Sequence, residues 1–308
     1  MRKSIAVIDL GTNTCNLLIA AYEQGDYHIL YQGKEAVKLG KNGIDKRLLT
    51  EDGMQRAVGA IHKHQEKMNE YHVDEVVIIA TSAIRDASNK DWFSQEIKSR
   101  TRLELRVISG DEEAELIFKG VKLAFGQIEE HSLILDIGGG SNEFILTEGG
   151  QPVWQESFPL GMARVVEQMP PSDPITESEI LQINHWFDSQ LSSLWERVSG
   201  LHLSTLIGCS GAFDTIADLI DHTDEGTKDR IRQEIILGNF NRVYEMLIAS
   251  SATERMQMKG MEPIRVEMIV PAVLFIQLII NRLNIQNIFQ TDFTLMHGML
   301  FERISEEK

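Results

Sequence analysis

The sequence predicts an α/β protein that is built of two lobes with a cleft between them. Apolar strand-like runs alternate with helical patterns along the chain, which favours an α/β architecture over an all-α or all-β one. One strand–turn–strand plan occurs twice, as IAVIDLGTNTCNLLI near the N-terminus and as SLILDIGGGSNEFIL farther on. A duplicated unit that opens each half is expected of a two-lobed protein, and 308 residues are enough for two cores.

Several short apolar or alternating runs predict strands, and in chain order they are IAVIDL, LLIAAY, EVVIIAT, LELRVIS, LILDIG, FILT, LSTLIG and NIFQ. An apolar stripe over 54–68 predicts a helix with Thr50 as its N-cap, and a longer amphipathic pattern runs over about 177–198. The apolar run MIVPAVLFIQLII at 268–280 is shorter than the roughly 20 residues of a membrane span, so we expect a buried helix there.

The two lobes are expected at 1–126 and 127–308. The boundary is the polar segment GQIEEH around 127–131, which separates a helical pattern from a strand without a low-complexity linker. The terminal helix could pack back on the first lobe.

Composition restricts the partners. The formal charge of −16 at pH 7 argues against binding to nucleic acid or to an anionic membrane. An anionic ligand would have to be met locally by backbone N–H groups, a metal, or a few Arg and Lys side chains. Two cysteines, Cys15 and Cys209, give neither a disulfide framework nor zinc spacing, and the N-terminus lacks a secretory pattern. These features predict a cytoplasmic protein and leave a homodimer open.

The duplicated turns are the main functional signal. In each copy a strand ends in an aspartate, Asp9 or Asp136, and a glycine turn with hydroxyl and amide residues follows. Glycines lower the barrier to positive φ and leave no side chain between the backbone and a ligand. A strand rather than a helix follows, which excludes a dinucleotide fingerprint, and no Gly-Lys-Ser/Thr follows, which excludes a Walker loop. A tight hairpin without a ligand is the alternative for either copy alone.

Five segments occur in an order that resembles a known family: SIAVIDLGTNTCNLLI, ATSAIRDASN, VISGDEEAELIFKGV, LILDIGGGSNE and ESFPLGMAR. Together they look like the exopolyphosphatase and guanosine pentaphosphate phosphohydrolase family, in its short form, which belongs to the actin and acetate/sugar kinase superfamily. The resemblance implies two ribonuclease-H-like lobes with a phosphate cleft between them. It also implies metal-dependent removal of terminal phosphate from linear polyphosphate or from guanosine pentaphosphate.

We expect both turns to bind phosphate, because successive backbone N–H groups form nests for anions. The residues of the two turns are Gly11, Thr12, Asn13, Thr14, Gly138, Gly139, Gly140 and Ser141. Arg85 matches a family motif and could bind phosphate through its guanidinium, with an ion pair to Asp86 or another acid as the alternative.

A third glycine turn, in LIGCSGAFDTIADL, supplies further candidates for phosphate binding, namely Gly208, Ser210 and Gly211. The chain departs from the family there, since Ala212 stands where relatives usually have Thr. Asn16 likewise stands where many relatives have Arg. Both departures bear on substrate preference.

The segment ISGDEEAELIF places a candidate catalytic carboxylate. Ser109 and Glu112 fit a capping box, and adjacent helical residues point about 100° apart, so Glu113 can face the cleft. The resemblance places the catalytic glutamate at Glu113 as well, as a general base or water-orienting group. The alternative is that Asp111, Glu112 and Glu113 only favour the positive end of the helix.

Asp136 and Glu143 flank the second turn and match the acidic pair of the family. Hard cations such as Mg²⁺ or Mn²⁺ take oxygen ligands and often use one or two carboxylates, so we expect a metal there. Asp9 is the counterpart in the first copy and could act through a water, with a structural role in its turn as the alternative. A run of Lys34, Lys38, Lys41, Lys46 and Arg47 is either a track for an extended polyanion or a solvated loop.

The sequence therefore predicts a metal-dependent hydrolase that releases orthophosphate from inorganic polyphosphate. Hydrolysis of guanosine pentaphosphate and non-catalytic binding of polyphosphate or nucleotide are the alternatives, and a superfamily kinase is a further rival. A cysteine phosphatase is excluded because its C-x5-R loop would need Arg where Ala21 and Thr215 stand.

Overall fold

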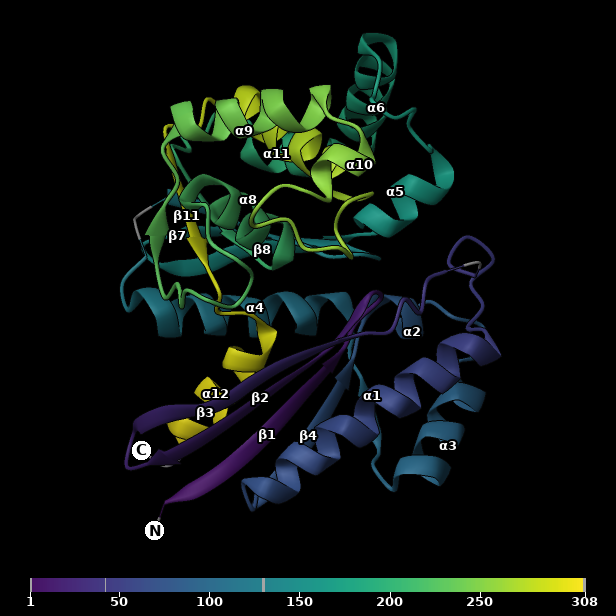
Figure 1. Ribbon diagram of the computed structural model, residues 1–308. Helices are drawn as coiled ribbons and strands as arrows, with labels where there is room; N and C mark the ends of the chain where they lie inside the picture. The colour runs from purple at the N-terminus through teal and green to yellow at the C-terminus, as the bar shows by residue number, and fades with distance from the viewer. Residues whose placement is uncertain (1, 42, 129–130, 307–308) are drawn as a thin grey trace. The chain divides into compact units, whose positions relative to one another are not determined.

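The structure of the protein, a computed structural model, describes residues 2–41, 43–128 and 131–306. Its chain divides into two units (Figure 1), of which the first comprises Met1–Leu123 and Phe293–Lys308 and the second Ala124–Asp292. The terminal segment thus groups with the first unit. Residues 129–130, within the polar segment where we expected the lobe boundary, lie outside the described residues.

The first unit contains a five-stranded sheet in the order β3-β2-β1-β4-β5. Its strands are β1 (Lys3–Leu10), β2 (Thr14–Glu23), β3 (Asp26–Ala36), β4 (Glu75–Ala80) and β5 (Leu105–Val107). The first three pair antiparallel, whereas β4 and β5 continue the sheet in parallel from β1. The carboxyl ends of β1 and β4 therefore lie at the same edge of the sheet.

Helices of the first unit are α1 (Glu51–Glu70), α2 (Ser82–Arg85), α3 (Lys90–Thr101), α4 (Gly110–Phe125, which runs into the second unit) and α12 (Leu295–Glu306). The predicted cap of α1 is confirmed, because the Thr50 hydroxyl accepts a hydrogen bond from the N–H of Gly53 at 3.1 Å. α12 packs on β1 and β2 (Figure 1), and Gly120 of α4 and Gly298 of α12 let those two helices approach closely.

The second unit repeats this topology. Its sheet runs β10-β11-β9-β6-β7-β8, so that β6, β7 and β8 take the places of β1, β2 and β3. The strands are β6 (His131–Ile137), β7 (Asn142–Glu148), β8 (Gln151–Phe158), β9 (Thr205–Cys209), β10 (Gln233–Glu234) and β11 (Asn287–Thr291). β9 and β11 extend the sheet in parallel, as β4 and β5 do in the first unit.

Helices of the second unit are α5 (Met162–Gln168), α6 (Glu177–Gln190), α7 (Ser192–Val198), α8 (Gly211–Asp221), α9 (Leu237–Ala249), α10 (Ala252–Arg255) and α11 (Ile269–Leu283). The pattern over 177–198 therefore forms two helices, which break at Leu191, a fully buried residue outside α-helical geometry (φ −100°, ψ 24°). α11 is buried in the core, as expected for the apolar run. Across the described residues, no helix has both the length and the apolar character that a membrane span requires.

Candidate active site

The first turn joins β1 to β2 and is fixed by its own backbone. The N–H of Gly11 donates to the carbonyl of Thr14 at 2.9 Å. The carbonyls of Thr12 and Asn13 accept hydrogen bonds from the segment 37–40, the shortest of which joins the N–H of Leu39 to Thr12 at 2.7 Å. Both of these carbonyl groups are therefore engaged by the protein itself.

The second turn, between β6 and β7, is built alike. The N–H of Gly138 donates to the carbonyl of Ser141 at 3.0 Å, the same pairing as in the first turn. The carbonyls of Gly138 and Gly139 accept hydrogen bonds from the start of α5, at 3.0 Å from the N–H of Met162 and at 2.9 Å from the N–H of residue 163. The side chain of Arg164 donates to the carbonyl of residue 140 at 3.2 Å.

These contacts orient the N–H groups of the turns. In a trans peptide the C=O and the following N–H point in opposite directions. Because the carbonyls of Gly138 and Gly139 point toward α5, the N–H groups of Gly139 and Gly140 point away from it, and they donate to no described residue. Such successive N–H groups suit an anion, as predicted for phosphate.

The expected reason for the glycines needs a correction. Neither Gly11 nor Gly138, Gly139 and Gly140 has positive φ. Space is the constraint instead, since a Cβ at Gly138 would lie 2.6 Å from the carbonyl oxygen of Ser141. A Cβ at Gly161, in the segment PLGMAR, would collide with the backbone of residues 139 and 140. The glycines therefore permit close approach rather than a left-handed backbone.

Asp136 and Glu143 form a buried acidic pair beside the second turn. They are direct partners across the antiparallel strands β6 and β7, so their side chains share one face of the sheet. Asp136 is 6% exposed and Glu143 is 1% exposed. The hydroxyl of Ser210 donates to Asp136 at 2.7 Å, and that of Ser157 donates to Glu143 at 2.6 Å. Burial raises the pKa of Asp136 to about 6, which the Ser210 hydrogen bond opposes.

The acidic pair fits a magnesium-type ion. Among the described residues, no three His, Cys, Asp or Glu side chains form a complete metal site. Mg²⁺ does not require one, because it usually retains several waters and uses one or two carboxylates together with substrate phosphates. Asp9 lies in the other unit, where the Asn16 amide donates to its carboxylate at 3.2 Å. The structure thus brings Asp136 and Glu143 together, and it places Asp9 in an equivalent position of the first unit.

Glu113 lies in the first turn of α4 and is buried, with 6% exposure. Ser109 accepts a hydrogen bond from the N–H of Glu112 at 3.1 Å, which is half of the predicted capping box. The predicted return hydrogen bond, from the N–H of Ser109 to the Glu112 carboxylate, is wrong, because that carboxylate pairs with Arg106. The predicted difference in direction is nevertheless present: Glu113 is buried, whereas Glu112 is partly exposed.

Arg85 holds Glu113 in place. Its Nη1 atom lies 2.6 Å from Oε2 of Glu113, and its Nε atom lies 3.8 Å from Asp86. The ion pair that we considered as an alternative to phosphate binding is therefore present. A guanidinium has five N–H donors, so pairing with one carboxylate leaves its chemistry compatible with an additional anion.

The third turn joins β9 to α8 beside the acidic pair, through the contact of Ser210 with Asp136. Gly208 is explained by packing, because a Cβ there would overlap the ring of Phe213. Gly211 is explained by Arg265, whose guanidinium lies directly against its backbone. Ser210 itself adopts a left-handed backbone, with φ of 66°.

Arg265 is a candidate residue that the sequence analysis missed. Its Nε atom pairs with Glu262 at 3.2 Å, whereas its terminal nitrogens donate to no described residue. The side chain is 15% exposed, and its charge partly opposes the burial that raises the pKa of Asp136. A largely buried guanidinium at the start of α8 suits a phosphate oxygen. No local motif marks this residue, since it reaches Gly211 from a distant part of the sequence.

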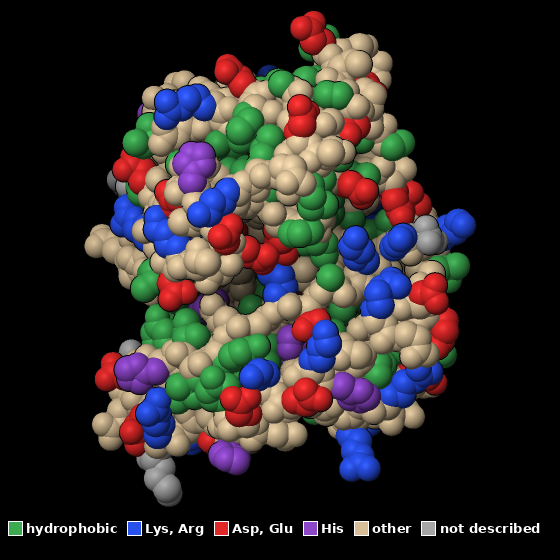
Figure 2. Space-filling model, in the orientation of Figure 1, with side chains coloured by type: hydrophobic (Ala, Val, Ile, Leu, Met, Phe, Trp, Pro, Cys, Tyr) green, Lys and Arg blue, Asp and Glu red, His purple; other side chains and the backbone are tan. Residues whose placement is uncertain are grey.

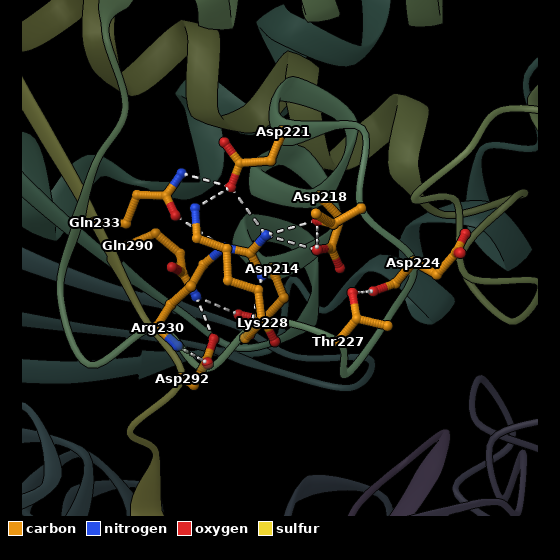
Figure 3. Close-up of polar contacts among 11 residues, drawn as sticks. Asp214, Asp218, Asp221, Asp224, Thr227, Lys228, Arg230, Gln233, Gln290 and Asp292 are labelled. Carbon is orange, nitrogen blue, oxygen red and sulfur yellow. Dashed lines mark hydrogen bonds and ion pairs between the residues drawn. The ribbon is translucent and has the colours of Figure 1, made fainter.

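A second group of carboxylates, in the same unit, is structural. Arg230 is 4% exposed and pairs with Asp218 at 2.7 Å (Figure 3). The amide of Gln290 donates to Asp214 at 2.8 Å and to Asp292 at 2.6 Å. Burial and the charge of Asp214 raise the pKa of Asp292 to about 6. These contacts join α8, β11 and the loop before β10, and we assign them to the stability of the unit.

The cysteines agree with the exclusion of thiol chemistry. Cys15 and Cys209 are fully buried, and burial raises the pKa of both thiols. A nucleophilic cysteine requires the thiolate, which a raised pKa disfavours.

Known proteins similar to this chain include phosphatases. The description "Ppx/GppA phosphatase family" applies to a family model that matches residues 18–307. The crystal structure of an exopolyphosphatase from Cytophaga hutchinsonii has a TM-score of 0.93 and 35% identity, and the similarity covers 99% of both chains. Exopolyphosphatase 1 of Mycobacterium leprae is 24% identical over 305 residues, which are 98% of this chain and 90% of the relative.

A bifunctional 3-dehydroquinate synthase/phosphatase of Fusobacterium nucleatum is 27% identical over 98% of this chain. This chain spans about half of that protein, 47% of its length. The duplicated sheet topology and these similarities confirm the predicted α/β fold of two ribonuclease-H-like lobes, and they confirm the predicted resemblance. The chain belongs to the Ppx/GppA phosphatase family.

Proposed function

We propose that this phosphatase is a metal-dependent exopolyphosphatase that releases terminal orthophosphate from linear inorganic polyphosphate. The second turn is the observation that carries the proposal. Outward N–H groups of Gly139 and Gly140 lie next to the buried carboxylates of Asp136 and Glu143 along the same hairpin. N–H donors suit phosphoryl oxygens and paired carboxylates suit a divalent cation, so the hairpin offers ligands for both partners of a metal–phosphate complex.

In the proposed reaction a water attacks the terminal phosphorus directly, and the bond to the bridging oxygen breaks without a phosphoenzyme. Glu113 orients this water and accepts its proton, while Arg85 fixes the Glu113 carboxylate. Asp136 and Glu143 would hold Mg²⁺ or Mn²⁺. The ion, when bound, would neutralise charge on the phosphoryl oxygens.

The remaining phosphate contacts come from the turns. We assign N–H and hydroxyl donors of both hairpin turns to the phosphoryl oxygens, together with Ser210 and the backbone at Gly211. Asp9, held by Asn16, would act through a water. Arg265 adds a guanidinium at the start of α8. Fixed donors of this kind stabilise the charge that spreads over the equatorial oxygens in phosphoryl transfer.

Polyphosphate is the favoured substrate for two reasons. The solved structure that is 35% identical over the whole chain carries the name exopolyphosphatase. The sequence also contains no recognisable guanine-reading feature. Hydrolysis of guanosine pentaphosphate is the comparison reaction, and phosphate release from both substrates under identical conditions distinguishes them.

Replacement of Glu113 by Gln tests the mechanism. The amide retains the shape of the side chain but cannot accept a proton, so turnover on polyphosphate should fall about 1,000-fold while binding persists. Glu112→Gln is the matched control, because Glu112 is the neighbouring residue and its side chain is partly exposed and pairs with Arg106 instead. Phosphate release should change less than about twofold in the control. Unchanged turnover in Glu113→Gln would refute the assigned role.

A further inference from the structure

The loop between β3 and α1 has an unusual charge for this protein. Residues 38–47 contain four cations, Lys38, Lys41, Lys46 and Arg47, and one acid, Asp45, which gives a net charge of +3 in a chain of net charge −16. We call these four cations the basic loop. Residue 42 lies outside the described residues and is not part of it. All four side chains belong to exposed residues, and Lys and Arg side chains stand out at this loop in Figure 2.

The cations of the basic loop are not neutralised by neighbouring acids. None of the four makes an ion pair with a carboxylate of the described residues. Three lysines on the nearby helices α1 and α3 are paired instead: Lys63 with Glu35 at 2.7 Å, Lys67 with Glu70 at 2.8 Å and Lys98 with Glu104 at 3.2 Å. With 46 acidic residues in the chain, four unpaired cations in one loop indicate an external anion.

The backbone of the loop is tied to the first turn. The N–H groups of Val37 and Lys38 both donate to the carbonyl of Asn13, at 2.8 and 3.0 Å. Lys38 adopts φ of 42°, so the chain bends sharply at the first member of the basic loop. The loop therefore begins at the turn that we assign to phosphate.

The far end of the loop is tied to the segment that carries Arg85. The carbonyl of Arg47 accepts hydrogen bonds from the N–H and hydroxyl of Ser88, at 2.8 and 3.1 Å. The side chain of Asn89 pairs with the backbone of Leu49 in both directions, at 2.8 and 2.9 Å. Both ends of the basic loop are thus held against elements of the candidate active site within the first unit.

We propose that the basic loop binds the tail of the polyphosphate chain, beyond the phosphates that occupy the turns, and thereby selects for long chains. This inference rests on the proposed function and adds the selection of chain length to it. Linear polyphosphate carries a negative charge on every unit, so its tail can contact several exposed cations in succession. A substrate of only a few phosphates would bind mainly through the turns, because it has few further charges to offer the loop.

A triple variant tests the proposal. Lys41→Ser, Lys46→Ser and Arg47→Asn remove three charges, and Asn is chosen for position 47 because it tolerates the observed φ of 51°. Lys38 is left intact because of its contact with the first turn. The matched control is Lys63→Ser, Lys67→Ser and Lys98→Ser, which removes the same charge from α1 and α3 in the same unit.

Two readouts are measured on the full chain. The first is kcat/KM for long-chain polyphosphate divided by kcat/KM for tripolyphosphate. This ratio should fall about tenfold in the loop variant and less than about twofold in the control, because the lost cations contact only the tail. The second is equilibrium binding of long-chain polyphosphate without divalent cation as a function of salt. Its logarithmic slope should decrease by about 2 in the loop variant, for three lost phosphate contacts.

The binding readout separates this inference from the proposed function. Length-dependent binding that is lost in the loop variant supports the basic loop even if the protein does not hydrolyse polyphosphate. Binding of long chains that matches the unaltered protein in strength and salt dependence would overturn the proposal. An equal loss for tripolyphosphate and long chains would overturn it as well, since the loop would then act on the first turn rather than on the tail.

Discussion

The two hairpins of the molecule have the same backbone and differ in one decisive side chain. In the first unit Asp9 lies opposite Asn16 across β1 and β2, and in the second unit Asp136 lies opposite Glu143 across β6 and β7. Both turns are closed by the same N–H to carbonyl bond, from Gly11 to Thr14 at 2.9 Å and from residue 138 to residue 141 at 3.0 Å. The amide of Asn16 in the first hairpin therefore stands at the position of the Glu143 carboxylate in the second.

This difference gives the two aspartates different electrostatic surroundings within the same hairpin fold. The Asn16 amide donates to Asp9, so the charge of the first aspartate is compensated by a hydrogen bond from within its own hairpin. Glu143 adds a second negative charge beside Asp136, and two buried carboxylates on one face favour a bound cation or a proton. In the proposed function the shared backbone would supply phosphate ligands in both copies, whereas the acidic pair would place the metal in the second copy.

The largest expected effect comes from removing the acidic pair. Glu143→Gln should lower turnover on polyphosphate about 1,000-fold, equivalent to about 4 kcal/mol, and raise the Mg²⁺ concentration needed for half of the maximal rate. Asp9→Asn should lower turnover only about tenfold, because an amide oxygen can still contact a water. Phosphate release measured across a range of Mg²⁺ concentrations checks both. If the two variants lost the same turnover and the same metal dependence, the assignment of the metal to the second copy would be wrong.

The next effect is the pH dependence of stability without metal. Burial raises the pKa of Asp136 from 3.8 to about 6, so the folded protein keeps a proton that the unfolded chain releases. The free energy of unfolding should therefore fall as the pH rises from about 4 to about 6, by about 3 kcal/mol for this shift. Asp136→Asn should remove that part of the slope, while Asp292, whose pKa is also raised, contributes to both proteins. Denaturant unfolding at several pH values measures the difference, and equal slopes would contradict it.

Much of the fold follows from local signals in the sequence. The paired turns, the Thr50 cap and the buried run at 268–280 are each written in a short segment, because turn chemistry, capping and periodicity act over a few residues. The third strands, β3 and β8, were not predicted. Their outer faces are exposed, so they lack the apolar runs that identified their neighbours.

The sequence predicted the position of a site residue only where short-range geometry determines where its side chain points. The inward direction of Glu113 follows from the capping of α4 and the helical period. Arg265 was missed because its contact with Gly211 joins segments far apart in the chain. The pairing of Arg85 with Glu113 was foreseen only as a general alternative, since nothing local specifies which acid Arg85 meets.

The smallest expected effect comes from substituting the glycine that packs against each turn. The second turn is backed by Gly161, where a Cβ would strike the backbone of residues 139 and 140, and backbone atoms cannot rotate away. The first turn is backed by Gly40, where a Cβ would lie 3.0 Å from the Thr12 methyl group and 3.2 Å from the end of Ile44, both of which are side-chain atoms. Gly161→Ala should therefore cost about 2 kcal/mol of stability and raise KM for polyphosphate, because the turn must shift.

Gly40→Ala is the matched substitution and should cost less than about 0.5 kcal/mol, since a methyl group can be accommodated by small side-chain movements. Denaturant midpoints of the two variants measure the stability difference, and KM measures the displacement of each turn. Similar losses of stability in both variants would contradict this prediction. They would mean that movement of α5 relieves the close approach of Gly161 to the second turn. A large cost confined to Gly161→Ala would show that the segment PLGMAR sets the position of the N–H groups of the second turn, the same hairpin that carries the acidic pair.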